Sequence, residues 1–347
     1  MSIYADIEKN LGSFHLKVKL EAGDETLALL GASGCGKSMT LKCIAGIEKP
    51  DRGRIVVDDV VLFDSEKKIN LTPQQRHTGL LFQNYALFPN MTVAQNIRAG
   101  LRREPDKKKR ETAAASVMES FGLTELANHL PHQLSGGQQQ RTALARILVS
   151  NPRILLLDEP FSALDNHLRF RLEQEVRQVI QDFGKTVLLV SHDRDEVFRL
   201  SDRIAIMDSG AIEATGSRAE VFANPRTRKG AVLTGCKNIS SMEVLENGQI
   251  WATDWDMVLE VPNLPPEAKA VGIRMHDIRP GPGKNGYRCR VVGEIENPFS
   301  YTVMLKPLNS DSASPIGWEM DKEVWRKLRS QEVGISLPPE ALLLLKD

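Results

Sequence analysis

The feature that most constrains this chain is a glycine-rich segment, Gly31-Ala32-Ser33-Gly34-Cys35-Gly36-Lys37-Ser38. The apolar run 27–30 leads directly into it, and residues 38–47 follow with a helical pattern closed by Gly46 and Pro50. Glycines at these spacings let backbone N–H groups turn inward around phosphate oxygens, and the helix adds the positive end of its dipole. The segment therefore predicts a strand, a phosphate loop and a helix, which is one unit of an α/β fold.

Further apolar runs extend this prediction to a sheet. Residues 154–157 and 187–190 are continuously apolar, which is typical of strands buried on both faces of a largely parallel sheet. Residues 204–207, followed by a polar turn at 208–210, predict a strand near the edge of the sheet. Residues 96–132 have a mostly helical pattern, so we expect a helical subdomain at about 84–150, inserted into the phosphate-loop core.

After about residue 225 the pattern becomes one of short alternating stretches separated by turns rich in Gly, Pro and Asn. These stretches predict a small all-β, OB-like barrel with one short helix at 321–328. A chain of 347 residues is long enough for two domains. We expect an α/β phosphate-loop domain over 1–232 and a small all-β domain over 233–347.

Composition excludes several classes of protein. Lys and Arg number 45, as do Asp and Glu, so the formal net charge is zero and no general affinity for nucleic acid is expected. No segment approaches the roughly 20 apolar residues that span a bilayer, and residues 1–20 lack the apolar core of a signal peptide. The four cysteines have no metal-ligand spacing. We therefore expect a cytoplasmic protein with reduced thiols, whose role at a membrane requires a partner.

Side chains suited to nucleotide chemistry lie at the ends of the predicted strands. Lys37 can reach the β- and γ-phosphates, and Ser38 can ligate Mg²⁺. Asp158, which follows the run 154–157, is placed to hold the same Mg²⁺. Glu159 can then orient the attacking water and accept its proton. The alternative, that two acids merely end a strand, is disfavoured by the phosphate loop upstream.

Two other polar residues also follow apolar runs. Gln83 is a neutral amide that can contact Mg²⁺ or the water, although a surface glutamine is the alternative. His192 ends the run 187–190, where the crevice of an α/β sheet lies, and could bond the γ-phosphate. A histidine that is simply a satisfied polar residue is its alternative.

A second phosphate site is predicted at Leu134-Ser135-Gly136-Gly137-Gln138. Two glycines and a serine hydroxyl at a helix start suit an anion. Because the first loop already covers one side of a triphosphate, the second site would serve a nucleotide held by a neighbouring subunit. In a two-fold dimer this arrangement repeats and gives two shared sites.

These motifs, in this order, resemble the ATP-binding subunits of ABC transporters over roughly residues 1–230. The resemblance also rests on Leu157-Asp158-Glu159-Pro160, Ser162-Ala163-Leu164-Asp165 and Ser191-His192-Asp193. It implies a head-to-tail homodimer that closes on two ATP molecules. In that dimer Glu159 would be the catalytic carboxylate, His192 the switch histidine and Asp165 a residue of the seam.

The same resemblance implies further contacts. The loop 85–89 would meet the coupling helix of a membrane permease, Met39 would join the nucleotide contacts, and an aromatic residue would lie under adenine. Phe14 is the first candidate for that aromatic residue, with Tyr4 nearby.

The junction Gly235-Cys236-Lys237-Asn238-Ile239-Ser240 resembles the molybdate importer group, with sulfate importers close to it. It implies a C-terminal regulatory domain of the TOBE type. Ser300, Thr302 and Lys306 are candidate donors to an oxyanion there, and a purely structural barrel is the equal alternative.

The function implied is an ATPase at the cytoplasmic face of the membrane that powers import of an oxyanion, molybdate first. Two permease subunits would be its partners, and an extracellular or periplasmic solute-binding protein would act indirectly. The alternatives are the same engine for sulfate, sugar or polyamine import, a soluble ABC ATPase not coupled to transport, and an oxyanion-sensing module.

Overall fold

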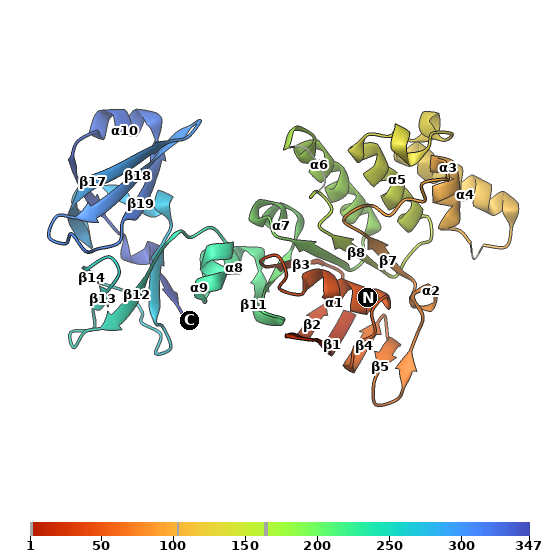
Figure 1. Ribbon diagram of the computed structural model, residues 1–347, viewed down its shortest axis with the longest axis horizontal. Helices are drawn as coiled ribbons and strands as arrows, with labels where there is room; N and C mark the ends of the chain where they lie inside the picture. Colours follow the sequence, from red (N-terminus) through yellow and green to blue (C-terminus); the bar gives the residue numbers. More distant parts are fainter. Residues whose placement is uncertain (1–2, 103, 163–165) are drawn as a thin grey trace. The chain divides into compact units, whose positions relative to one another are not determined.

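The computed structural model describes residues 3–102, 104–162 and 166–347 (Figure 1). The chain divides into two compact units, residues 1–218 and 219–347. The division lies upstream of the boundary that we predicted at 232/233.

The reason is that two short helices, α8 (Arg218–Ala223) and α9 (Arg228–Leu233), and the residue after α9 are bonded to residues that flank the C-terminal strands. The Arg274 guanidinium donates to the carbonyl oxygens of Phe222 and Thr234. Arg228 lies 3.1 Å from the Asp347 carboxylate. These bonds place residues 219–232 with the second unit.

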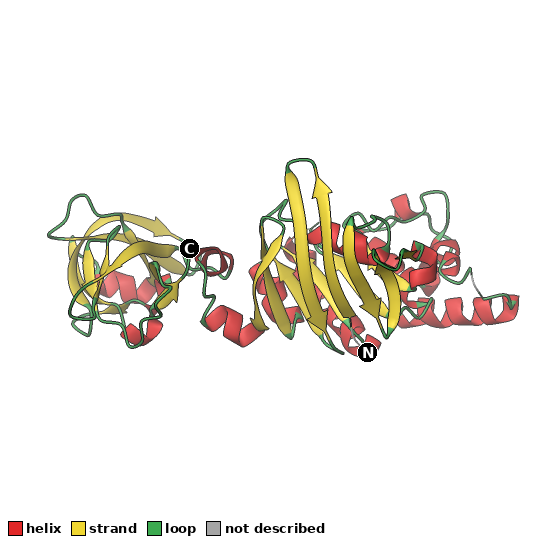
Figure 2. Ribbon diagram, turned by 90° about the horizontal axis from the view of Figure 1, so that it is seen from below, coloured by secondary structure: helices red, strands yellow, loops and turns green. Residues whose placement is uncertain are grey.

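A single sheet forms the centre of the first unit, and among the described residues it has eleven strands in the order β6-β5-β4-β1-β2-β11-β10-β3-β9-β8-β7 (Figure 2). Its strands are β1 (Ile3–Leu11), β2 (Phe14–Ala22), β3 (Thr26–Leu30), β4 (Arg52–Val57), β5 (Val60–Asp64), β6 (Ile69–Asn70), β7 (Thr78–Leu81), β8 (Ile154–Asp158), β9 (Val187–Ser191), β10 (Arg203–Asp208) and β11 (Ala211–Ser217).

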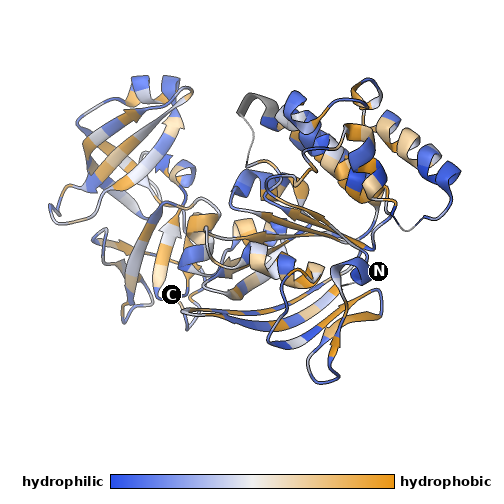
Figure 3. Cartoon of the chain, turned by 45° about the vertical axis from the view of Figure 1, so that its right-hand side comes forward, coloured by the Kyte–Doolittle hydropathy of each residue, from blue (hydrophilic) through white to orange (hydrophobic). Residues whose placement is uncertain are grey.

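The strands β10, β3, β9, β8 and β7 are parallel, as the continuous apolar runs predicted. Every residue of β3, β8 and β9 is buried, and the hydrophobic residues of this unit gather along the central strands (Figure 3). The prediction that residues 204–207 lie near the sheet edge is wrong. They form β10 in the interior, because the next strand, β11, pairs with β10 on its outer side.

The strands β1, β2, β4, β5 and β6 pair in antiparallel fashion and were not part of the predicted sheet. In β2 every second side chain is buried, so one face packs on the core while charged residues occupy the other. The two halves of the sheet meet where β2 runs parallel to β11, and only one residue pair, Lys17 with Ala211, is in register there. The Lys17 N–H donates to the Gly210 carbonyl at 2.7 Å in the same place.

Helices cover this sheet and form a separate cluster beside it. They are α1 (Lys37–Ala45), α2 (Pro73–Arg76), α3 (Val93–Ala99), α4 (Lys107–Ser120), α5 (Gly136–Leu148), α6 (Asn166–Phe183) and α7 (Arg194–Leu200). Helices α3, α4 and α5 share a small core of their own, which includes Val93, Ile97, Ala114 and Ala145. None of the helices formed by the described residues is long and apolar enough to cross a lipid bilayer.

The second unit contains two antiparallel sheets of five strands each within the described residues, β14-β13-β12-β15-β21 and β16-β20-β17-β18-β19. The strands are β12 (Asn238–Val244), β13 (Ile250–Ala252), β14 (Met257–Leu259), β15 (Ala270–Ile273), β16 (Arg279–Pro280), β17 (Gly286–Glu296), β18 (Ser300–Pro307), β19 (Ile316–Asp321), β20 (Glu332–Ser336) and β21 (Leu343–Leu345). Both sheets contribute to one core with Trp255, Trp318 and Trp325 at its centre. The predicted all-β character is confirmed, and α10 (Lys322–Leu328) lies where the short helix was expected.

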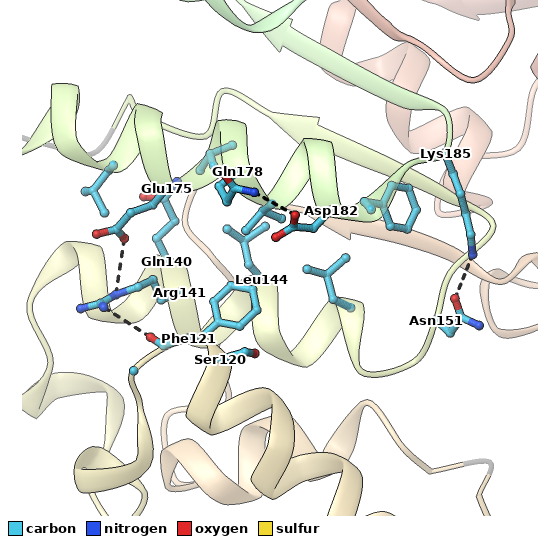
Figure 4. Close-up of a pocket in the computed structure, with 16 residues that line it drawn as sticks. Ser120, Phe121, Gln140, Arg141, Leu144, Asn151, Glu175, Gln178, Asp182 and Lys185 are labelled. Atoms are coloured by element: carbon cyan, nitrogen blue, oxygen red, sulfur yellow. Dashed lines mark hydrogen bonds and ion pairs between the residues drawn. The ribbon is translucent and has the colours of Figure 1, made fainter.

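A cavity of about 580 Å³ lies between α5 and α6 (Figure 4). Its wall is largely apolar and includes Leu144 and Leu172. The side chain of Gln140 belongs to this wall but is 0% exposed, and neither atom of its amide group has a hydrogen-bond partner. A buried amide without a partner loses its bonds to water and gains none in return.

We therefore expect Gln140→Leu to leave the stability of the first unit unchanged or to raise it by about 1 kcal/mol, because the substitution removes an uncompensated polar group. Urea denaturation followed by circular dichroism measures this. Thr142→Val is the matched control on the same helix, since the buried Thr142 hydroxyl donates to the Gln138 carbonyl at 2.7 Å and its removal should destabilise. A loss of stability in Gln140→Leu would contradict the expectation.

Candidate nucleotide site

The phosphate loop joins β3 to α1, and its last glycine begins the helix. Gly36 is the N-cap of α1 with φ 106°, in the left-handed region. A Cβ atom at Gly36 would lie 2.7 Å from Leu16 Cδ1 and 3.2 Å from Phe14 Cζ. Only glycine satisfies both the backbone conformation and this close packing.

The Lys37 side chain is buried inside this loop. Its ammonium group donates to the carbonyl oxygens of Gly31 and Ala32, both at 2.8 Å. A positive charge is thus enclosed by the same loop whose glycines expose backbone N–H groups. A phosphate group is the partner that this combination suits.

Ser38 and Asp158 are in direct contact, although 120 residues separate them in sequence. The Ser38 hydroxyl donates to Asp158 Oδ1 at 2.6 Å. Burial raises the pKa of Asp158, the hydrogen bond from Ser38 opposes that shift, and the charge of Glu159 adds to it. A hydroxyl and a carboxylate side by side are hard oxygen ligands of the kind that Mg²⁺ prefers.

Glu159 and His192 also meet, because β8 and β9 are neighbouring parallel strands whose carboxyl ends lie together. His192 Nδ1 is 3.2 Å from Glu159 Oε1, with the glutamate side chain 18% exposed and the histidine 54% exposed. Glu159 has φ 45°, and its N–H donates to the Val190 carbonyl at 2.9 Å. A residue held in the left-handed region is strained, and such strain gathers at functional sites.

Gln83 is exposed in the loop that follows β7, the neighbour of β8. Beyond it, Tyr85 and Ala86 have φ values of 60° and 44°. Arg146 of α5 donates to both of their carbonyl oxygens, at 2.9 and 2.7 Å, and its guanidinium lies 5.2 Å from the ring centre of Phe88. Sequence reasoning missed Arg146, and no local pattern marks it.

Ser135 caps the N-terminus of α5. Its hydroxyl accepts a bond from the Gln138 N–H at 3.4 Å, and its own N–H donates to Gln138 Oε1 at 2.8 Å. This reciprocal pair is a capping box, so Gly136 and Gly137 form the first turn of the helix, as the sequence predicted. Helix α5 packs with α3 and α4, whereas Lys37 and Glu159 come after the carboxyl ends of the central strands β3 and β8.

Phe14 begins β2 and lies beside the loop at Gly36, whereas Tyr4 lies on β1 with its hydroxyl 3.4 Å from Asp6 Oδ2. Phe14 is therefore the better placed of the two aromatic candidates. Met39 is half-buried in the first turn of α1. Asp165, which we expected at a dimer seam, lies outside the described residues.

The candidate oxyanion donors of the second unit already have partners. The Ser300 hydroxyl donates to Glu319 Oε1 at 2.9 Å, and Lys306 donates to the Asp311 carbonyl at 3.0 Å. Thr302 accepts a bond from the Asn297 amide at 3.1 Å. The carboxylate of Glu319 beside Ser300 disfavours an anion at this place, so the geometry favours the structural alternative for these three residues.

Comparison with known proteins agrees with this geometry. The model of the family described as ABC transporter matches residues 14–162. Over 211 residues the chain is 44% identical to the trehalose/maltose import ATP-binding protein MalK of Thermococcus litoralis, a match that covers 60% of this chain and spans only 57% of the length of that relative. Over 282 residues it is 38% identical to the sulfate/thiosulfate import ATP-binding protein CysA 2 of Rhizobium meliloti, covering 79% of this chain and 75% of that protein.

A solved structure has the same fold. It is the dimeric post-hydrolysis state of the ATP-binding cassette MJ0796 bound to ADP and Pi, with a TM-score of 0.53 and 30% identity. The match covers 63% of this chain and 99% of that chain. The site geometry, the fold and these similarities together show that the chain belongs to the family of ATP-binding proteins of ABC transporters and carries an ABC ATPase domain.

Proposed function

We propose that this protein is the ATP-hydrolysing subunit of a membrane importer and that it powers uptake of an oxyanion, with molybdate as the first candidate. The observation that carries the ATPase part is the meeting of two pairs at one edge of the sheet. Ser38 bonds Asp158 at 2.6 Å, and Glu159 lies 3.2 Å from His192. The first pair suits a metal-bound phosphate, and the second suits activation of water.

In this proposal the loop 31–38, with Met39, encloses the phosphates, and Lys37 binds the β- and γ-phosphates. Ser38 and Asp158, joined by Gln83, would hold Mg²⁺, and the ion would offset the negative charge of the phosphates when bound. Phe14 would stack on the adenine. The bonds that Lys37 now makes to two loop carbonyls would give way to stronger bonds with phosphate oxygens.

Hydrolysis would proceed by attack of a water molecule on the γ-phosphorus. Glu159 accepts the proton of that water, the bond from the γ-phosphorus to the oxygen of ADP breaks, and ADP and inorganic phosphate are released. We assign His192 to hold Glu159 in place and to bond the γ-phosphate. The strained backbone of Glu159 would fix the carboxylate in a single direction.

Two copies would bind ATP between them. Ser135, Gly136, Gly137 and Gln138 would contact the nucleotide of the opposite copy, and Asp165 would lie at the seam. Support comes from the position of the first four at the start of α5, whereas Lys37 lies at the start of a different helix, α1 (Figure 1). The solved relative of similar fold is itself dimeric.

The contact with two permease subunits would be made by the loop 85–89. Phe88 of that loop is 43% exposed. The loop backbone is held from two helices, because Asn96 of α3 accepts a bond from the Phe88 N–H and Arg146 of α5 donates to the Ala86 carbonyl. An exposed aromatic residue on a braced loop suits docking to a partner helix. This contact would place the protein at the cytoplasmic face of the membrane, with a solute-binding protein acting from the other side.

The choice of an oxyanion rests on how far the relatives extend along the chain. The match to the sulfate/thiosulfate relative covers 79% of the chain, which is more than the first unit of 218 residues can supply, so it reaches into the second unit. The match to the trehalose/maltose relative covers 60%, and that to the spermidine/putrescine import ATP-binding protein PotA of Bacillus cereus covers 67%, so the sulfate/thiosulfate match is the longest of these three. Sulfate, sugar and polyamine import, and an ATPase without a transport partner, are the alternatives.

Glu159→Gln is expected to lower the turnover number for ATP by about a thousandfold, because the amide cannot accept a proton from water. ATP should still bind and should hold the two copies together. Phosphate release and light scattering measure the two effects on the full-length protein, and the exposed Glu119→Gln serves as control. Turnover that persists in Glu159→Gln would show that another residue is the base.

The cargo is tested with the protein assembled with its permease and solute-binding protein in lipid vesicles. ATP hydrolysis should rise severalfold when the binding protein is loaded with molybdate, and less with sulfate, maltose or putrescine. If sulfate were the stronger activator, the proposal of oxyanion import would stand, with sulfate in place of molybdate as the transported ion. Activation by maltose or putrescine alone would contradict the oxyanion proposal.

A further inference from the structure

A buried acid lies beneath the loop that carries His192. Glu196 belongs to α7 and is 2% exposed. Its carboxylate accepts a hydrogen bond from the Ser191 hydroxyl at 2.6 Å and another from Arg169 Nε at 2.9 Å. Ser191 is the last residue of β9, so Glu196 is bonded to the residue that directly precedes His192.

The Ser191 hydroxyl links both sides of His192. It donates its proton to Glu196 and accepts a hydrogen bond from the Asp193 N–H at 2.9 Å. An ionised carboxylate can only accept, so Glu196 fixes the direction of the hydroxyl proton and leaves the oxygen to receive the Asp193 N–H. The backbone on either side of the histidine is thereby held by one side chain.

Arg169 of α6 completes the arrangement. Its guanidinium bonds Glu196 and also lies 3.2 Å from Asp193 Oδ2. Asp193 in turn caps α7 by accepting bonds from the N–H groups of Asp195 and Glu196. Burial raises the pKa of Glu196, and the bonds from Ser191 and Arg169 oppose that shift. The cluster is therefore a satisfied network rather than an isolated buried charge.

We propose that Glu196 is a positioning residue for His192: it holds the Ser191 hydroxyl and so fixes the backbone that aims the histidine at Glu159, 3.2 Å away. This inference rests on the proposed roles of His192 and Glu159 in hydrolysis. Glu196 is almost fully buried, and its carboxylate is occupied by Ser191 and Arg169. It acts only through the geometry of residues 191–193.

The chain offers a matched control for a purely structural role. Glu173 of α6 is 3% exposed and accepts two bonds from Arg199 of α7, at 2.7 and 3.0 Å. It joins the same two helices with a buried ion pair. Among the described contacts, however, its carboxylate bonds Arg199, lies 3.9 Å from Arg169 Nε and contacts none of residues 191–193. A merely structural Glu196 would behave like Glu173.

The experiment compares Glu196→Gln with Glu173→Gln in the full-length protein. In Glu196→Gln an amide N–H₂ replaces one oxygen, so the Ser191 hydroxyl or Arg169 loses its acceptor. We expect kcat for ATP to fall about tenfold with KM within about twofold of the wild type, because the phosphate loop is untouched. Glu173→Gln should lower the melting temperature to a similar extent but change kcat by less than about twofold.

Two further measurements separate positioning from loss of folding. The kcat of Ser191→Ala should fall as in Glu196→Gln, and the double variant should be no slower than either single variant, since both act through one bond. Hydrogen exchange at the Asp193 N–H should accelerate in Glu196→Gln and not in Glu173→Gln. If Glu196→Gln does not fold, Ser191→Ala with its own kcat and KM decides the question.

Equal kcat values for Glu196→Gln and Glu173→Gln would overturn the inference. So would a kcat in the double variant that falls by the product of the two single effects. Unchanged exchange at the Asp193 N–H would do the same without reference to activity. A wild-type protein that hydrolyses no ATP would instead overturn the proposed function. In that case the exchange measurement still tests whether Glu196 fixes the loop.

Discussion

The structure depends on the parallel register of three neighbouring strands. Leu30 of β3 pairs with Ser191 of β9, and Asp158 of β8 pairs with Val190. This register brings the phosphate loop, the two acids and the histidine to the same end of the sheet, because Asp158 is the last residue of its strand and the others follow the carboxyl ends of theirs. A shift of one residue in any of the three strands would turn its buried side chains to the opposite face and separate the Ser38–Asp158 pair.

Much of this arrangement can be predicted from sequence, and the reason is local. A strand buried on both faces is a continuous apolar run, and the polar residue that ends it marks the site, as Asp158 and His192 do. In the antiparallel strands β1 and β2, buried side chains alternate with more exposed ones. Such a pattern indicates a strand but does not say which strands lie next to it in the sheet. The interior position of β10 could not be predicted because it depends on β11, which follows it and pairs on its outer side.

The residues that brace the site could not be predicted at all. Arg146 reaches carbonyls that lie 60 and 61 residues earlier, and Arg169 reaches an acid 27 residues later. Such bonds depend on how helices pack against loops, and nothing in the neighbouring residues signals them. The spacing of Asp193 and Glu196 suggests a capping box, in which the glutamate would bond back to the N–H of the cap. In the structure the Ser191 hydroxyl takes that N–H, and the glutamate turns inward.

The narrow joint between β2 and β11 has a mechanical consequence. The parallel half of the sheet carries the phosphate loop, and the antiparallel half carries Phe14, yet one registered residue pair connects the two. Side chains of both halves nevertheless pack in one hydrophobic core, so packing rather than strand pairing connects the halves here. In the proposed binding mode the base lies on Phe14 and the phosphates lie in the loop, so the nucleotide would contact both halves of the sheet. Occupancy in that proposed mode would add a further connection between the two halves, beside the core that they already share.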